Sequence, residues 1–200
     1  MSTTVLEGSA AVLSLLGVWL MTRRVRIAWP VGLVSVGLYA LVFAEARLYS
    51  DTLLQIAFGG FLLYGWLNWR GHVGEDGRVG IVALPRGRMV RDLVVGVVFG
   101  VFLGALMHTH THAALPWLDA MLAALSLVAQ WWQARRHAAA WWLWIAVDVV
   151  YVGMYLVKSL HVTAALYLVF TAVAVMGLRA WTANARRTAV ACADPASGIR

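Results

Sequence analysis

The sequence predicts an all-α, polytopic membrane protein with seven transmembrane helices, arranged as two parallel three-helix repeats joined by a linker helix. Three observations lead to this prediction. Hydrophobic residues make up 62% of the chain and charged residues only 12%, whereas soluble domains are about half apolar and a quarter charged. Long charge-free runs recur along the chain, and its first part resembles its last part.

The charge-free runs define the expected spans. A helix needs roughly 20 apolar residues to cross the hydrocarbon core. Helices are expected because unpaired backbone groups in lipid cost several kcal/mol each. The longest polar stretch, Arg70–Met89, is rich in glycine and is predicted to be a loop. The seven spans expected around these runs lie near Val5–Met21, Ile27–Ala44, Thr52–Trp69, Val90–Met107, Trp117–Gln133, Ala140–Val157 and Val162–Trp181.

The basic residues indicate the orientation. With seven spans, one side of the membrane receives only Arg47 and Lys158. Positive residues concentrate on the cytoplasmic side, so we expect the N-terminus outside and the C-terminus inside a cell (inner) membrane. Topology thus explains the high pI, and no nucleic-acid partner is expected. The other side receives Arg23, Arg24, Arg26, Arg70, Arg78, Arg86, Arg88, Arg91, Arg135, Arg136, Arg179, Arg186, Arg187 and Arg200.

An internal repeat sets the expected domain organisation. A shift of 112 positions matches Leu13-Ser14-Leu15 to Leu125-Ser126-Leu127 and Arg23-Arg24 to Arg135-Arg136. For the middle helix, a shift of 113 sets Ser35 against Asp148, although Gly37-x-Tyr39 can instead be set against Gly153-x-Tyr155. We expect a first repeat with its cytoplasmic loop at 1–89, a linker helix at 90–112, a second repeat at 113–182 and a disordered cytoplasmic tail at 183–200.

The orientation of the repeats points to a class of protein. Four spans separate equivalent positions, so both units cross the membrane in the same direction. Parallel repeats of this kind occur in carriers, which bind their substrate near the midplane between the repeats. The sequence therefore favours a carrier that works by rocking two three-helix units around a central site.

Asp148 is the strongest candidate for such a site. It is an acid deep within a predicted span, where an ionisable group is costly and usually functional; the alternative is a structural hydrogen bond to another helix. Tryptophans and tyrosines at spacings of three and four share its helix face. An indole face attracts a delocalised cation, so this face suits a flat cationic ring. The face consists of Trp141, Trp144, Asp148, Tyr151 and Tyr155.

Other polar side chains give weaker signals. Gln55, Asn68, Gln130 and Tyr167 lie within or at the ends of predicted spans, where amides and hydroxyls either join helices or meet a polar solute. Trp142 is expected in the aromatic belt at the membrane interface. The alternating His108, His110 and His112 could bind a transition metal, but no carboxylate or cysteine lies nearby, so neither a metal nor a cofactor is expected.

These residues together resemble the PnuC family of vitamin transporters over nearly the whole chain. The resemblance is carried by Trp29-Pro30-Val31-Gly32, Leu48-Tyr49-x-x-x-Leu53-Leu54-Gln55, Tyr64-Gly65-Trp66-x-Asn68-Trp69, Trp141-x-x-Trp144-x-x-x-Asp148 and Leu166-Tyr167. It implies a SWEET-like three-plus-one-plus-three layout, facilitated diffusion and a homotrimer. It also implies nicotinamide riboside as the substrate, with thiamine or riboflavin as alternatives, because Asp148 and Ser35 stand where riboside carriers have asparagine. The expected substrate-binding residues are Asp148, Trp144, Trp141, Gln55, Asn68, Gln130, Tyr151, Tyr167 and Ser35.

Other classes of protein fit less well. An intramembrane enzyme needs a nucleophile with a base, or clustered metal ligands, and the chain has no Gly-x-Ser-x-Gly or His-Glu-x-x-His motif. A seven-helix photoreceptor needs a lysine within a span, whereas Lys158 lies at the end of one. A passive scaffold explains neither Asp148 nor the polar residues within the spans. We therefore expect a carrier with no enzymatic activity.

Overall fold

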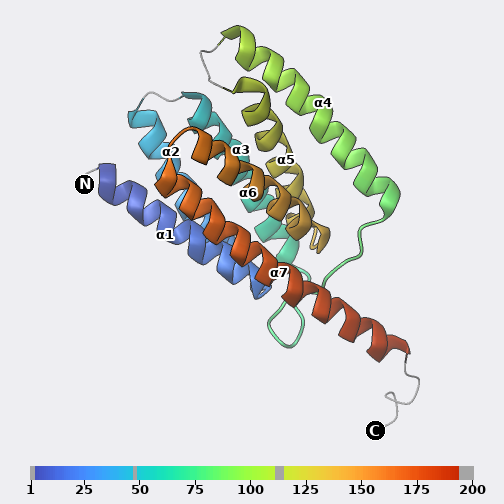
Figure 1. Cartoon of the computed structure of the whole chain (residues 1–200). Coiled ribbons are helices and arrows are strands. Elements are labelled where there is room, and N and C mark those ends of the chain that lie inside the picture. The colour runs from blue at the N-terminus through green and yellow to red at the C-terminus, as the bar shows by residue number, and fades with distance from the viewer. Residues whose placement is uncertain (1–2, 47–48, 111–114, 194–200) are drawn as a thin grey trace.

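The computed structural model describes residues 3–46, 49–110 and 115–193, which form seven helices (Figure 1). The prediction of an all-helical protein with seven helices is confirmed. Within the described residues, the two termini of the helical bundle lie at opposite ends (Figure 1). The helices are α1 (Thr3–Thr22), α2 (Ala28–Glu45), α3 (Tyr49–Arg70), α4 (Arg86–His110), α5 (Pro116–Ala134), α6 (Ala139–Val157) and α7 (His161–Ala193).

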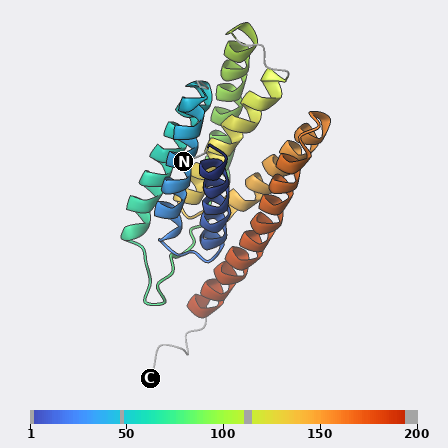
Figure 2. The same cartoon turned by 90° about the vertical axis from the view of Figure 1, so that its left-hand side faces the viewer.

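The helices form two similar units linked by α4. Within the first unit α2 packs on both α1 and α3, and within the second α6 packs on both α5 and α7. Between the units α1 contacts α7 and α5 contacts α3, which is the pattern that a twofold axis requires. Helix α4 lies at the side of the bundle and packs mainly on α5 (Figures 1 and 2). This arrangement agrees with the parallel repeats proposed from the sequence.

Length and composition allow five of the seven helices to cross a membrane: α1, α2, α4, α6 and α7. Helices α3 and α5 are less apolar, and the packing of α5 explains its composition. Helix α5 contacts α3, α4 and α6, and much of its surface, including Gln130 and Gln133, is buried. A helix surrounded by protein rather than lipid can keep polar side chains that find partners inside the bundle.

The end of α7 differs from the prediction. A disordered tail was expected from residue 183, but α7 continues to Ala193. The segment 183–193 contains five alanines, and alanine has the highest intrinsic helix propensity. The polarity of this segment therefore misled the prediction, because polarity alone does not prevent a helix from continuing out of the membrane.

Four buried tryptophans show the register of the repeat. The ring of Trp29 packs on Gly65 and makes an edge contact with Trp69, at 5.1 Å between ring centroids. In the second unit Trp141 packs on Gly177 and makes an edge contact with Trp181, at 5.6 Å. Each of these pairs of positions is related by a shift of 112. The proposed shift of 113 for the middle helix, which set Ser35 against Asp148, is therefore wrong, and Asp148 corresponds to Val36.

We call Trp29, Trp69, Trp141 and Trp181 the tryptophan cluster. Trp69 also contacts Trp181, at 6.0 Å between ring centroids, so the cluster is continuous across both units. All four side chains are at most 1% exposed. The cluster lies toward the end of the bundle that carries most of the arginines, which we call the arginine-rich end. It belongs to the largest group of buried apolar residues in the described chain.

Candidate functional site

A central cavity of about 480 Å³ lies between the two units. Its volume falls within the range of about 300–1,000 Å³ that is usual for small-molecule sites. It receives side chains from α1, α2, α3, α5, α6 and α7, and none from α4. The polar and aromatic residues of the lining are Glu7, Ser14, Tyr39, Phe43, Gln55, Phe58, Gln130, Gln133, Trp141, Trp144, Asp148, Tyr155, Thr163, Tyr167 and Phe170.

Asp148 lies at the middle of α6 and lines this cavity. It is only 6% exposed. Among the described residues, no side chain or backbone group makes a hydrogen bond or an ion pair with its carboxylate, so a structural link to another helix is not what holds it there. A carboxylate placed at membrane depth without a partner is costly. This site is therefore chemically suited to a cationic ligand that would supply the missing partner.

Trp144 lies one turn before Asp148 and also lines the cavity. Its indole N–H donates to the Oε1 atom of Gln133 on α5, at 2.7 Å. The hydrogen bond fixes the ring and orients the amide of Gln133, whose remaining N–H groups stay available to a ligand. Trp142, in contrast, is 65% exposed and points away from the cavity, as expected for a residue of the interfacial belt.

Two aromatic groups lie toward the end of the cavity opposite the arginine-rich end. Tyr39 and Phe43 of α2 stack at 5.8 Å between ring centroids. On the other side, Tyr167 of α7 contacts Tyr155 of α6 at 5.2 Å and Phe170 at 5.9 Å. All five residues line the cavity.

Sequence reasoning missed several residues at this end of the cavity, among them Glu7, Tyr39 and Phe43. Glu7 of α1 adds a second carboxylate to the lining. A signal was present, because Glu7, Ser14, Val18 and Met21 recur at spacings of seven, four and three residues, which places them on one helix face. All four line the cavity.

The structure brings six of the nine expected site residues to the cavity: Asp148, Trp144, Trp141, Gln55, Gln130 and Tyr167. Asn68, Ser35 and Tyr151 lie outside its lining. Asn68 donates to the backbone oxygen of Ala134 at 2.9 Å. Ser35 bonds Ser14 at 2.7 Å and donates to the backbone oxygen of Ala10 at 2.8 Å. Tyr151 packs among Tyr155 and Tyr167.

The arginine-rich end of the cavity is closed by hydrogen bonds between the units. The indole N–H of Trp69 in the first unit donates to the backbone oxygen of Ala134 in the second, at 3.1 Å. The indole N–H of Trp181 in the second unit donates to the backbone oxygen of Met21 in the first, at 3.2 Å. Since the tryptophan cluster is fully buried, it separates the cavity from the arginine-rich surface.

A segment of the α3–α4 loop, residues 79–82, runs beneath both units, and we call it the strap. The backbone N–H of Val79 donates to the backbone oxygen of Arg24, and that of Val82 donates to the backbone oxygen of Arg136, each at 3.1 Å. Arg24 and Arg136 are equivalent positions of the repeat and both adopt a positive φ, of 61° and 66°. The strap thus binds the same corner of each unit.

Side chains complete the binding of the strap. Arg24, which is 7% exposed, donates to the backbone oxygen of Val79 at 3.1 Å and to Asn184 at 2.8 Å. Nδ1 of His137 lies 2.9 Å from the backbone oxygen of Val82. Because a carbonyl oxygen only accepts, Nδ1 carries the proton. Burial lowers the pKa of His137 below its ordinary value of 6.5; the hydrogen bond to Val82 opposes this shift, and the charges of Arg135, Arg88 and Arg136 add to it.

Two of the three alternating histidines, His108 and His110, lie in the last turn of α4. His108 contacts the ring of Trp117, at 6.1 Å between centroids. His112 lies outside the described residues. Among the residues that the structure describes, no group of three or more His, Cys, Asp or Glu side chains is placed to hold a metal ion.

The fold and the cavity define a polytopic membrane carrier, with two parallel three-helix units around a closed-ended site for a small solute. A sequence model of the nicotinamide mononucleotide transporter family matches residues 4–183. The chain belongs to this family, which confirms the resemblance seen in the sequence.

The chain is similar to several characterised proteins. The nicotinamide riboside transporter PnuC of Escherichia coli K12 is 26% identical over 180 residues, covering 78% of this chain and 75% of that protein. The riboflavin/roseoflavin transporter RibM of Streptomyces davaonensis is 28% identical over 182 residues, covering 88% and 84%. The crystal structure of the vitamin B3 transporter PnuC matches with a TM-score of 0.76 at 26% identity, covering 92% of this chain and 83% of that one.

Proposed function

We propose that this protein takes up nicotinamide riboside by facilitated diffusion and so supplies NAD salvage. The proposal rests on one observation above all: the carboxylate of Asp148 faces the cavity without a hydrogen bond or ion pair from the described residues. Nicotinamide riboside carries a cationic aromatic ring, so it would supply the charge that this site lacks. The names of the E. coli relative and of the matching crystal structure support the same substrate class.

The lining residues suggest a role for each part of the substrate. The ring of Trp144, held by Gln133, would stack on the pyridinium ring while Asp148 compensates its charge. Trp141 closes the cavity beneath the ring at the arginine-rich end. Gln55, Gln130 and the hydroxyl of Tyr167 would then orient the ribose through hydrogen bonds.

Riboflavin is the second candidate, favoured by the similarity to RibM. Its ring system is neutral, so it gains nothing from the charge of Asp148, and we rank it below the riboside for this reason. Thiamine carries a cationic ring and suits the same carboxylate. The cavity chemistry separates cationic from neutral vitamins more sharply than it separates the two cationic ones.

The transport cycle proposed here follows from the twofold arrangement. The structure has the arginine-rich end closed by the tryptophan cluster and the strap. Rocking of the two units would open this end and close the other. We further propose that the arginine-rich end is cytoplasmic, that the N-terminus lies outside the inner membrane, and that the protein assembles as a homotrimer.

The substrate can be identified by titrating purified protein with nicotinamide riboside, thiamine and riboflavin, following tryptophan fluorescence and, for coloured riboflavin, calorimetry. Stacking on Trp144 should quench its fluorescence. We expect nicotinamide riboside to bind most tightly. We also expect it to enter proteoliposomes until its concentrations inside and outside are equal. Tighter binding of riboflavin, or accumulation against a gradient, would contradict the proposal.

The charge of Asp148 provides a direct mutational test. Asp148→Asn keeps the size of the side chain but removes its charge, and should weaken binding of the cationic riboside by about tenfold or more. Asp119→Asn serves as the matched control, because Asp119 lies on α5 outside the cavity lining. Equal riboside affinity in both variants would remove Asp148 from the proposed site, whereas a neutral substrate should be insensitive to both changes.

A further inference from the structure

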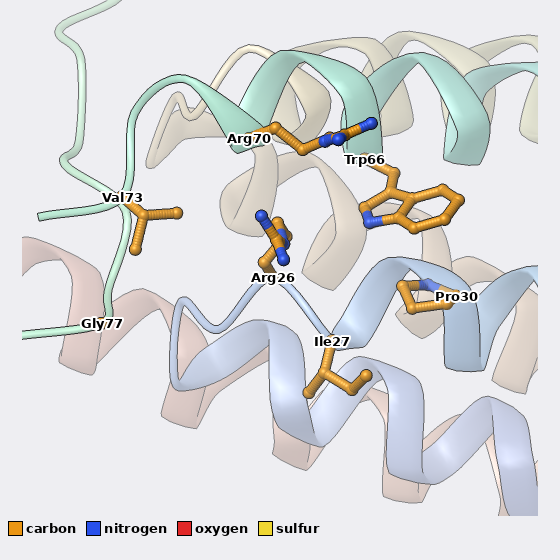
Figure 3. A pocket seen from close by; sticks show the side chains of 7 residues that line it. All are labelled: Arg26, Ile27, Pro30, Trp66, Arg70, Val73 and Gly77. Carbon is orange, nitrogen blue, oxygen red and sulfur yellow. The ribbon is translucent and has the colours of Figure 1, made fainter.

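A second pocket, of about 390 Å³, opens at the arginine-rich end, away from the central cavity. It lies between the start of α2, the end of α3 and the loop that follows α3 (Figure 3). We call it the arginine pocket, and its lining consists of Arg26, Ile27, Pro30, Trp66, Arg70, Val73 and Gly77. It shares no residue with the central cavity.

The two arginines of this pocket are free to bind an anion. Figure 3 shows the guanidinium group of Arg26 standing between α3, which carries Arg70 and Trp66, and the start of α2. Both arginines are exposed, and within the described chain neither guanidinium group makes a hydrogen bond or an ion pair. The lining contains no acid. Two acids, Glu75 and Asp76, follow in the loop outside this lining, and Asp76 accepts from the backbone N–H of Arg78 at 3.0 Å.

The internal repeat shows that the fold does not require these arginines. The shift of 112 relates the two tryptophan pairs of the cluster and also two cation–π contacts, Arg23 over Trp19 and Arg135 over Trp131, each at 4.8 Å. At the same shift Arg26 corresponds to Ala138 and Arg70 to Thr182. The second unit builds the same corner without either charge, so the arginine pair is a feature of this surface and not of the architecture.

The walls of the pocket favour a ligand that is part lipid. Ile27 is 57% exposed and Val73 is 39% exposed, and Leu67, beside Trp66, is 53% exposed. Apolar side chains at this level, next to cationic groups, fit a head group together with the first carbons of its acyl chains. Guanidinium groups bind phosphate oxygens through paired, charge-assisted hydrogen bonds, and basic pockets between helices on the cytoplasmic side are suited to anionic lipids.

We propose that the arginine pocket binds the phosphate of an anionic phospholipid. Arg26 and Arg70 hold the phosphodiester oxygens, while Ile27, Pro30 and Trp66 contact the glycerol and upper acyl region. The bound lipid bridges α2 and α3 of the first unit only, because the second unit lacks both arginines. A free phosphate ion shares the same head-group chemistry, and the experiment must distinguish the two sources.

The test is native mass spectrometry of purified, delipidated protein with phosphatidylglycerol, with phosphatidylcholine as the zwitterionic comparison. Arg26→Gln with Arg70→Gln should weaken binding of phosphatidylglycerol by about tenfold. Arg86→Gln with Arg88→Gln removes the same charge from exposed positions outside the pocket and should bind like the wild type. Arg26→Lys with Arg70→Lys keeps the charge and should retain part of the affinity.

Three outcomes bear on the proposal. Selective loss of phosphatidylglycerol binding in the Arg26/Arg70 glutamine pair supports it, provided that the melting temperature stays unchanged. Equal loss in the Arg86/Arg88 pair overturns it, because the effect is then one of net charge. Displacement of the lipid by millimolar inorganic phosphate overturns the lipid as the ligand and assigns the pocket to free phosphate.

Discussion

Gly65 and Gly177 are the residues that make room for the tryptophan cluster. A Cβ atom added to Gly177 would lie 2.6 Å from the ring of Trp141, and one added to Gly65 would overlap the ring of Trp29. Both glycines therefore exist for close packing and not for chain flexibility. The two sites differ in one respect, since Trp141 lines the central cavity and Trp29 does not.

This difference leads to a prediction for the two glycines. Gly65→Ala and Gly177→Ala should each destabilise the protein by about 1–3 kcal/mol, the usual cost of overpacking a core. Only Gly177→Ala should also weaken riboside binding, because it displaces Trp141. Melting temperature and fluorescence titration provide the two measurements.

Glycines that have open space beside them provide matched controls. A Cβ atom at Gly60 of α3 or Gly153 of α6 would meet no atom within 4 Å, so alanine there should leave the melting temperature equal or raise it, as alanine is the better helix former. A Gly177→Ala variant as stable as Gly153→Ala would contradict the packing argument.

The strap is an element that neither unit could form alone. Residues 79–82 bond to Arg24 of one unit and to Arg136 and His137 of the other. A left-handed backbone costs a non-glycine residue roughly 1–2 kcal/mol, and at both arginines it turns a carbonyl oxygen toward the strap. The hydrogen bond that each carbonyl oxygen accepts from the strap offsets this cost. The strap thus ties the positions of the two units to one loop.

His137 makes this connection sensitive to pH. Burial and the neighbouring arginines lower the pKa of His137 in the folded protein, so the unfolded chain takes up its proton at a higher pH. The contribution of His137 to the free energy of unfolding is then complete above about pH 6.5 and is lost as the pH falls below that value. The melting temperature should therefore decrease between about pH 7.5 and pH 5.5.

The source of that decrease can be tested with two variants. His137→Gln should lower the melting temperature at neutral pH but flatten its pH dependence. His72→Gln should keep the wild-type dependence, because His72 is exposed and lies outside the strap. An unchanged slope in His137→Gln would assign the pH dependence to other groups.

For the molecule as a whole, the sequence predicted those features for which placing a residue type within the membrane has a clear free-energy cost. Charge-free runs gave the seven helices, and the cost of a buried carboxylate pointed to Asp148. The sequence failed where a polar group had two plausible partners. The amide of Asn68 could equally have faced a solute, but Ala134 ends α5 and its carbonyl has no partner within that helix. Asn68 and Trp69 supply the two donors.

The path of the strap was also beyond prediction. It depends on positive φ angles at Arg24 and Arg136, which no local pattern indicates, since arginine rarely adopts them. For the register of the middle helix, in contrast, the sequence does contain a signal. Trp29 and Trp141 match at the same shift of 112 as the rest of the repeat, and their packing on Gly65 and Gly177 overturns the alignment of Ser35 with Asp148.

Both units contribute to closing the arginine-rich end of the cavity, because Trp69 and Trp181 each donate a hydrogen bond to the other unit. Opening this end requires both bonds and the contact between the two rings to break. The acceptors keep other donors, because Asn68 also donates to Ala134 and the backbone N–H of Arg24 donates to Met21. Replacing either tryptophan with phenylalanine therefore removes one bond without leaving a buried carbonyl oxygen unpaired.

We accordingly predict that Trp69→Phe and Trp181→Phe each favour the open state by about 1 kcal/mol, or about fivefold. The measurement uses Ala174→Cys, a buried cavity position near the cluster, with the native Cys192 replaced by serine. A membrane-impermeant maleimide added at the arginine-rich side should label this cysteine faster in both variants. Trp142→Phe, on the exposed face of α6, should not change the rate. Equal rates in all variants would show that the cluster is not the barrier at this end.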